Sequence, residues 1–149
     1  MNKPFIVVLG KPGSGKSSVL RRTFSQVRES AAFLDGDHDF EQMMHIVHES
    51  GFQKSSYFYC PIPEDLPSIV EERTESVIFV DTPRLTEDLV KQIAKAAKDR
   101  KVVLSVTSLS EELPVELEPL VSNVIILREN REEVTNAIVE AIESSVENV

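Results

Sequence analysis

The sequence predicts an α/β domain in which a mainly parallel sheet of about five strands carries helices on both faces. Apolar runs of strand length recur along the chain, amphipathic helical patterns lie between them, and the runs lack the polar alternation of a half-exposed sheet. Strands that alternate with helices pair mainly in parallel. With 149 residues, enough for one substantial core, residues 1–149 are expected to form a single domain.

The expected strands are the most apolar segments of the chain, and each is short enough to cross a sheet once. They are residues 5–9, 31–34, 77–80, 102–106 and 123–127.

Helical patterns fill most of the intervening segments, at residues 16–28, 39–50, 86–98 and about 131–147. Gly51 suits the end of the second helix, and Thr86 and Asn130 suit the N-caps of the third and fourth. The proline-containing segments 55–72 and 108–120 are expected to be loops or short broken helices.

Composition limits the classes of partner and the compartment. The chain has 25 carboxylates against 16 Lys and Arg, a net charge of −9, which argues against extensive binding to nucleic acid phosphates. Its lone cysteine, Cys60, excludes an internal disulfide and a cysteine-based zinc site, and favours a reducing compartment. No apolar run reaches the roughly 18 residues of a membrane span. We therefore expect a cytoplasmic protein with no membrane span.

Residues 10–18, GKPGSGKSS, match the phosphate-binding P-loop pattern G-x-x-x-x-G-K-S. The match lies where the pattern requires it, after a predicted strand and at the start of a predicted helix. Glycines let the backbone curl so that its N–H groups face phosphate oxygens, and the helix dipole points at the same place. The expected nucleotide contacts are Gly10, Lys11, Pro12, Gly13, Ser14, Gly15, Lys16, Ser17 and Ser18.

Two side chains of this loop have individual expected roles. Lys16 brings a positive charge to the terminal phosphates, and the Ser17 hydroxyl is placed to bind Mg²⁺. A P-loop of this type needs a carboxylate on another strand to complete the magnesium shell. Asp81 follows the apolar run 77–80, at the carboxyl end where parallel sheets bind ligands, and is the expected Walker B residue. The absence of an Asn-Lys-x-Asp guanine motif favours ATP.

A second carboxylate cluster, DGDHD at residues 35–39, follows the second predicted strand. The cluster has two interpretations that the sequence leaves open: groups that position a water, bind Mg²⁺ or accept a substrate proton, or a solvated turn that begins a helix. Asp35 is the candidate for positioning the attacking water. The histidines His38, His45 and His48 are interpreted as surface residues rather than metal ligands, because no cysteine or second tight motif accompanies them.

These motifs together resemble the secretion and pilus ATPases. DGDHDF looks like the acidic box of that family, and DTPRLTED keeps its arginine as Arg84 and its downstream acid as Glu87. The resemblance implies a P-loop NTPase fold, Mg-ATP hydrolysis, and an Arg84 that senses the terminal phosphate of its own or a neighbouring subunit. From the same resemblance we expect a homo-oligomer or a protein partner.

The chain departs from that family at two catalytic positions. Thr82 stands where the family has a catalytic Glu beside the Walker B residue, and Thr107 stands where it has a His. Only nine residues precede the P-loop, so the family's N-terminal domain is not expected in this chain. A reduced ATPase with slow or absent turnover is therefore the expectation.

Two alternatives remain open from the sequence. FLDGD, residues 33–37, is similar to the strand-end Asp-Gly-Asp of adenylylsulfate and gluconate kinases, in which Asp35 or Asp37 would accept the substrate proton. Such kinases carry an arginine-rich lid, whereas residues 108–122 contain no Arg or Lys. The other alternative is a nucleotide-gated interaction module with little turnover, which Thr82 and Thr107 favour.

Overall fold

The protein folds as the expected α/β structure. A computed structural model describes residues 3–10, 14–50, 56–107, 113–127 and 131–147. Within these ranges one six-stranded sheet has the order β3-β2-β4-β5-β1-β6, and every strand pair is parallel. The strands are β1 (Phe5–Gly10), β2 (Ala31–Asp35), β3 (Tyr57–Tyr59), β4 (Val77–Thr82), β5 (Lys101–Thr107) and β6 (Asn123–Ile126).

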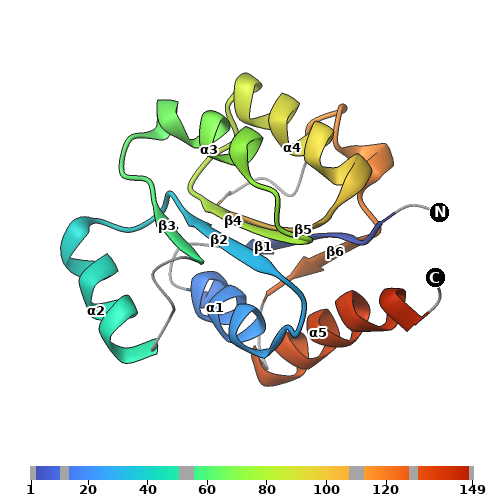
Figure 1. Cartoon of the computed structure of the whole chain (residues 1–149), viewed down its shortest axis with the longest axis horizontal. Helices are drawn as coiled ribbons and strands as arrows, with labels where there is room; N and C mark the ends of the chain where they lie inside the picture. Colours follow the sequence, from blue (N-terminus) through green and yellow to red (C-terminus); the bar gives the residue numbers. More distant parts are fainter. Residues whose placement is uncertain (1–2, 11–13, 51–55, 108–112, 128–130, 148–149) are drawn as a thin grey trace.

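Helices cover both faces of this sheet (Figure 1). The α-helices are α1 (Lys16–Gln26), α2 (Phe40–Ser50), α3 (Leu66–Glu72), α4 (Glu87–Asp99) and α5 (Arg131–Glu147). Helices α3 and α4 lie on one face, whereas α1 and α5 lie on the other; α2 lies beyond the β3 edge. Two 3₁₀ turns, η1 (Pro63–Asp65) and η2 (Glu118–Leu120), complete the described elements.

The side chains of the strands pack into two separate cores, one on each face of the sheet. In β1, Phe5, Val7 and Leu9 pack into the core beneath α3 and α4, while Ile6 and Val8 pack into the core beneath α1 and α5. Both sets are at most 3% exposed. The inner strands are therefore uniformly apolar because both of their faces are buried. The edge strand β6 is the exception, since Val124 is 49% and Ile126 38% exposed.

Segment 55–72 contains the main departure from the predicted elements. Residues 57–59 form the edge strand β3, which raises the sheet from about five strands to six. The short broken helices expected in both proline-containing segments are present as η1, α3 and η2. Elsewhere α1 ends at Gln26 rather than at residue 28.

The Thr86 cap is confirmed, because its hydroxyl accepts the Leu89 N–H at 3.2 Å. Gly51 and Asn130 lie outside the described residues.

The pairing of the strands places the candidate site residues along the carboxyl edge of the sheet, which is the row formed by the carboxyl ends of the parallel strands. Asp35 of β2 pairs with Asp81 of β4, and Gly10 of β1 pairs with Thr107 of β5. All four positions are at the carboxyl ends of their strands. None of the described helices is both long enough and apolar enough to cross a membrane.

Candidate functional site

Gly10, the last residue of β1, lies close to Ser14, which precedes α1 by two residues. A Cβ atom added at Gly10 would lie 2.4 Å from Ser14 Oγ, so a side chain at position 10 would collide with the Ser14 side chain. Gly15 has φ = 97°, a left-handed conformation that glycine adopts without strain. No side chain caps α1, so its first N–H groups remain available to an anion. Lys11, Pro12 and Gly13 lie outside the described residues.

Lys16 begins α1 and is 4% exposed. Burial lowers the pKa of its ammonium group, and the negative charges of Asp37 and Asp81 oppose that shift. The positive charge therefore lies beside carboxylates at the carboxyl edge. This placement is suited to the negatively charged oxygens of a phosphate chain.

Ser17 and Asp81 are joined across the sheet edge. The Ser17 hydroxyl donates to Asp81 Oδ2 at 2.6 Å, although the two residues are 64 positions apart. Asp81 is fully buried, and its Oδ1 has no hydrogen-bond partner among the described residues. Burial is the main cause that raises the pKa of Asp81 to about 7. A hydroxyl and a carboxylate supply the hard oxygen donors that fit Mg²⁺.

Asp35 is held by a network of hydrogen bonds. His38 Nδ1 lies 2.8 and 2.9 Å from its two carboxylate oxygens, the Tyr57 hydroxyl donates to Oδ2, and the Asp37 N–H donates to Oδ1 at 3.0 Å. Burial opposes ionisation of Asp35, but the hydrogen bonds from His38 and Tyr57 outweigh it and lower the pKa of this carboxyl. Asp35 is therefore an ionised, firmly oriented carboxylate.

The other groups around Asp35 respond to its charge. Burial would lower the pKa of His38, but the hydrogen bond and charge of Asp35 raise it overall. Burial and the same charge raise the pKa of Tyr57. Burial also raises the pKa of Asp37, and the neighbouring Lys16 and His38 oppose this shift. The carboxyl groups at this edge therefore differ in their tendency to ionise. Asp35 has a lowered pKa and is ionised, whereas Asp37 and Asp81 have raised pKa values and keep a proton more readily.

The structure brings together Lys16, Ser17, Asp35 and Asp81 of the predicted site residues. Arg84 follows β4 with an exposed side chain, for which the described part of the chain provides no hydrogen bond or ion pair. The neighbouring Thr82 is 4% exposed, and its hydroxyl donates to the Arg84 carbonyl oxygen at 2.8 Å.

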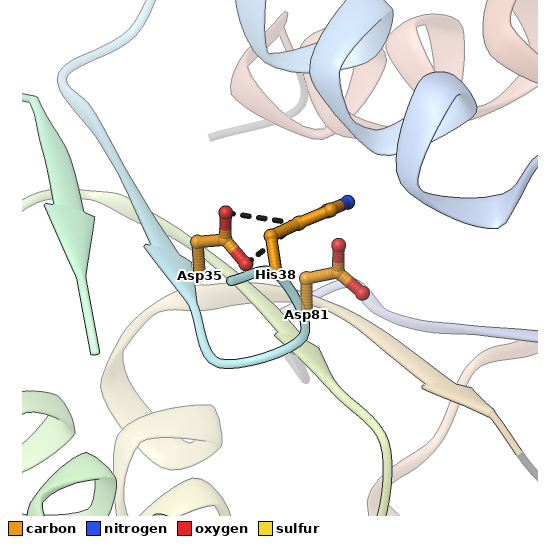
Figure 2. A group of neighbouring side chains, drawn as sticks. All are labelled: Asp35, His38 and Asp81. Carbon is orange, nitrogen blue, oxygen red and sulfur yellow. Dashed lines mark hydrogen bonds and ion pairs between the residues drawn. The ribbon is translucent and has the colours of Figure 1, made fainter. Parts of the chain in front are cut away.

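His38 and Tyr57 both contact Asp35, and neither was named as a site residue from the sequence. The interpretation of His38 as a surface residue was wrong, because its side chain is only 14% exposed and is bound to Asp35. His45 and His48 are exposed on α2, as expected. Donor atoms of Asp35, His38 and Asp81 all lie within 4.8 Å of one another, and Figure 2 shows these side chains projecting to the same side of the strand ends. The Asp35-x-x-His38 spacing was the available signal.

Comparisons with known proteins establish the fold. No protein-family model matches the chain, and neither does any curated protein. Among solved structures, the ATPase DotB of Legionella pneumophila is similar over 99% of this chain, with a TM-score of 0.53 and 13% identity. The genome-packaging NTPase B204 of Sulfolobus turreted icosahedral virus 2, solved with ATP-γ-S, covers 99% of this chain and 87% of its own, with a TM-score of 0.49 and 15% identity.

The chain spans 52% of the length of DotB. At 13% identity this likeness concerns the fold alone, which is that of the P-loop NTPases.

Proposed function

We propose that this chain is a Mg-ATP-binding P-loop NTPase, a reduced ATPase of the secretion-motor type that works in the cytoplasm. The hydrogen bond from Ser17 to Asp81 carries the proposal, because it brings the two expected magnesium residues together across 64 positions. The likeness of the fold to DotB and the start of α1, which no side chain caps, support it. Arg84 and Glu87 support the finer assignment to secretion motors by resemblance.

Each residue of the site has a defined part in holding the nucleotide. The N–H groups at the start of α1 and the Lys16 ammonium bind the phosphates, and Ser17 and Asp81 hold Mg²⁺. Mg²⁺ held by these residues would neutralise charge that develops on the phosphate oxygens. Asp81 supports this site through Oδ2, the oxygen that accepts the Ser17 hydroxyl.

We assign water positioning to Asp35 and terminal-phosphate sensing to Arg84. The network around Asp35 keeps its carboxylate ionised, which suits orienting a water more than removing its proton, because a low pKa makes a weak base. Arg84 is exposed beyond β4, where it can reach a neighbouring subunit. The resulting ATPase should be slow.

A nucleotide-gated interaction module is the second candidate, and Thr82 favours it. Position 82 has no carboxylate, and the Thr82 hydroxyl is committed to the Arg84 carbonyl oxygen rather than to the site. Bound nucleotide would then order the segments after β2 and β4 for a protein partner or a second copy of the chain. Turnover would be minimal.

Calorimetric titration of Mg-ATP into the Lys16→Ala variant tests nucleotide binding. Loss of a charge-assisted contact should weaken affinity by about 10- to 100-fold, while circular dichroism remains that of the folded protein. The matched control is Lys98→Ala, which removes an exposed lysine from α4 and should leave affinity unchanged. Equal affinity of Lys16→Ala and the unmodified protein would contradict the assignment.

Turnover separates the candidate reactions once binding is established. ATP loss without an acceptor identifies an ATPase, and tight binding without loss identifies the module. Loss that depends on a small hydroxylated acceptor would instead support the kinase alternative, for which Asp37 has the raised pKa that a proton acceptor needs.

A further inference from the structure

Asp35, His38 and Asp81 form a mixed donor set of one imidazole and two carboxylates. They come from the end of β2, the segment before α2 and the end of β4. Their donor atoms lie within 4.8 Å of one another, and the Asp35 Oδ1 to His38 Nδ1 distance is 2.8 Å. Figure 2 shows that all three project into the same space. Chain segments far apart in sequence therefore converge at one point.

These separations are close to those around a first-row metal ion. In octahedral coordination, an ion about 2.1 Å from each donor atom places adjacent donor atoms about 3.0 Å apart and opposite donor atoms about 4.2 Å apart. The Asp35 to His38 pair already satisfies the shorter distance. The 4.8 Å limit exceeds the longer distance by only about 0.6 Å, which a small side-chain rotation removes.

Asp81 provides an independent indication of a missing ligand. It is fully buried, Ser17 occupies its Oδ2, and its Oδ1 has no hydrogen-bond partner among the described residues. A buried carboxylate oxygen without a partner costs free energy, which a cation would offset. The two oxygens of Asp81 thus offer one contact to the Ser17 side, where we place the Mg²⁺ of the nucleotide, and one to a second cation.

We propose that Asp35, His38 and Asp81 bind a transition-metal dication of the Mn²⁺, Co²⁺ or Zn²⁺ class, separate from the Mg²⁺ of the nucleotide. Imidazole nitrogen selects such ions over Mg²⁺, which prefers an all-oxygen shell. The carboxylates of Asp35 and Asp81 supply the negative charge. The Tyr57 hydroxyl and the Asp37 N–H orient Asp35 from outside the donor set, as outer partners do in metal sites.

A bound metal would replace the proton shared by His38 and Asp35. Nδ1 of His38 faces the Asp35 carboxylate at hydrogen-bond distance, so a proton lies between them in the metal-free protein. From the imidazolium form of His38, binding through Nδ1 releases that proton to solvent while Nε2 keeps its own, so the ring binds as a neutral imidazole. The metal then takes the place of the proton between the ring and the carboxylate.

Titration of Co²⁺ into the nucleotide-free chain, followed by visible absorption in excess Mg²⁺, tests the site. The unmodified protein should bind one equivalent, and His38→Gln should bind at least about 10-fold more weakly. His45→Gln, which removes an exposed histidine of α2, should bind like the unmodified protein. Wild-type binding by His38→Gln, or displacement of all Co²⁺ by Mg²⁺, would overturn the proposal.

Pulsed electron paramagnetic resonance of Mn²⁺ on the unmodified protein tests the same claim without a substitution. Coupling to an imidazole nitrogen supports the proposal, and a spectrum with oxygen ligands alone overturns it. The Lys16→Ala variant separates this proposal from the proposed function: it should lose Mg-ATP affinity yet keep Co²⁺ binding. If neither the unmodified protein nor any variant bound Mg-ATP while Co²⁺ binding was retained, the proposed function would be refuted and the proposed metal site would still be supported.

Discussion

At the scale of single residues, several side chains of the site have pKa values shifted from their ordinary range. Asp81 is fully buried with one oxygen unpartnered, and burial raises its pKa to about 7. Asp35 is equally buried, but its hydrogen-bond donors keep its pKa low. Two carboxylates that pair in register on adjacent strands therefore differ because only one has a full set of donors.

The stability of the protein in EDTA, without nucleotide, should fall as the pH rises from about 4 to 7. Asp81, with its pKa raised from 3.8 to about 7, keeps its proton when folded in a range where the unfolded chain has lost it. The folded state then binds more protons, so a higher pH favours unfolding, by at most about 1.4 kcal/mol per pH unit for each such group. Asp37 acts in the same direction, and His38 extends the fall above pH 6.5.

Urea unfolding at several pH values measures this slope. The Asp81→Asn variant should flatten it, whereas Asp99→Asn, at the exposed end of α4, should keep it. Asp35 does not contribute in this window, because its lowered pKa acts below pH 3.8. Stability that rises steadily between pH 4 and 7 would contradict the raised pKa of Asp81.

Tyr57→Phe should destabilise the protein by about 1.5 to 3 kcal/mol, because it removes a hydrogen bond to the buried Asp35 carboxylate. The ring itself stays, so its stacking on Phe33, with centroids 5.7 Å apart, is preserved. Urea unfolding at pH 7 gives the difference. Tyr59→Phe, two residues along the same strand, is the control and should change stability little. Equal effects of the two substitutions would show that the hydrogen bond is not responsible.

The sequence predicts some site residues and not others for a physical reason. Lys16, Ser17 and Asp81 follow from a local loop pattern and from the end of an apolar strand, so their meeting is implied by parallel strand order. Tyr57 reaches Asp35 from a different strand, and no local pattern encodes that contact. His38 lies three residues from Asp35, but its burial depends on how the segment after β2 turns back over the sheet edge.

At the scale of elements, the amphipathic helices and the fully buried strands were predictable. Helix α4 shows why, because Thr86 caps it and Leu89 and Ile93 form one buried side, features all encoded locally. Strand β3 was not predictable, since its three residues are too few to show periodicity and its pairing depends on β2. Helix α3 has seven residues and a proline in its first turn, a helix-start signal that is equally typical of a turn.

At the scale of the whole molecule, the two ends of the parallel strands carry different groups. The carboxyl edge gathers Lys16, Ser17, Asp35 and Asp81, whereas the amino edge is closed by a structural ion pair. Lys101 begins β5 with its side chain 6% exposed, and its Nζ donates to Glu29 at 2.6 Å and to the Ile142 carbonyl oxygen at 2.8 Å. It thus ties β5 to α5 and to the segment before β2.

Lys101→Met should therefore lower stability without affecting the site. Breaking this pair leaves Glu29 partly buried without its cation, and because Glu29 is 21% exposed we expect a loss of about 2 to 3 kcal/mol. Urea unfolding measures the loss, and Lys98→Met on the exposed side of α4 is the matched control. Mg-ATP affinity should remain that of the unmodified protein. A change in affinity as large as that of Lys16→Ala would contradict the division between the two edges.

A crystal structure with Mg²⁺ and a non-hydrolysable ATP analogue tests the central claim most directly. We expect the phosphates to lie against the N–H groups at the start of α1 and the Lys16 ammonium, with Mg²⁺ bound to the Ser17 hydroxyl and facing Asp81. An analogue bound elsewhere, or a Ser17 to Asp81 hydrogen bond left unchanged at saturating nucleotide with no density beside it, would contradict the account.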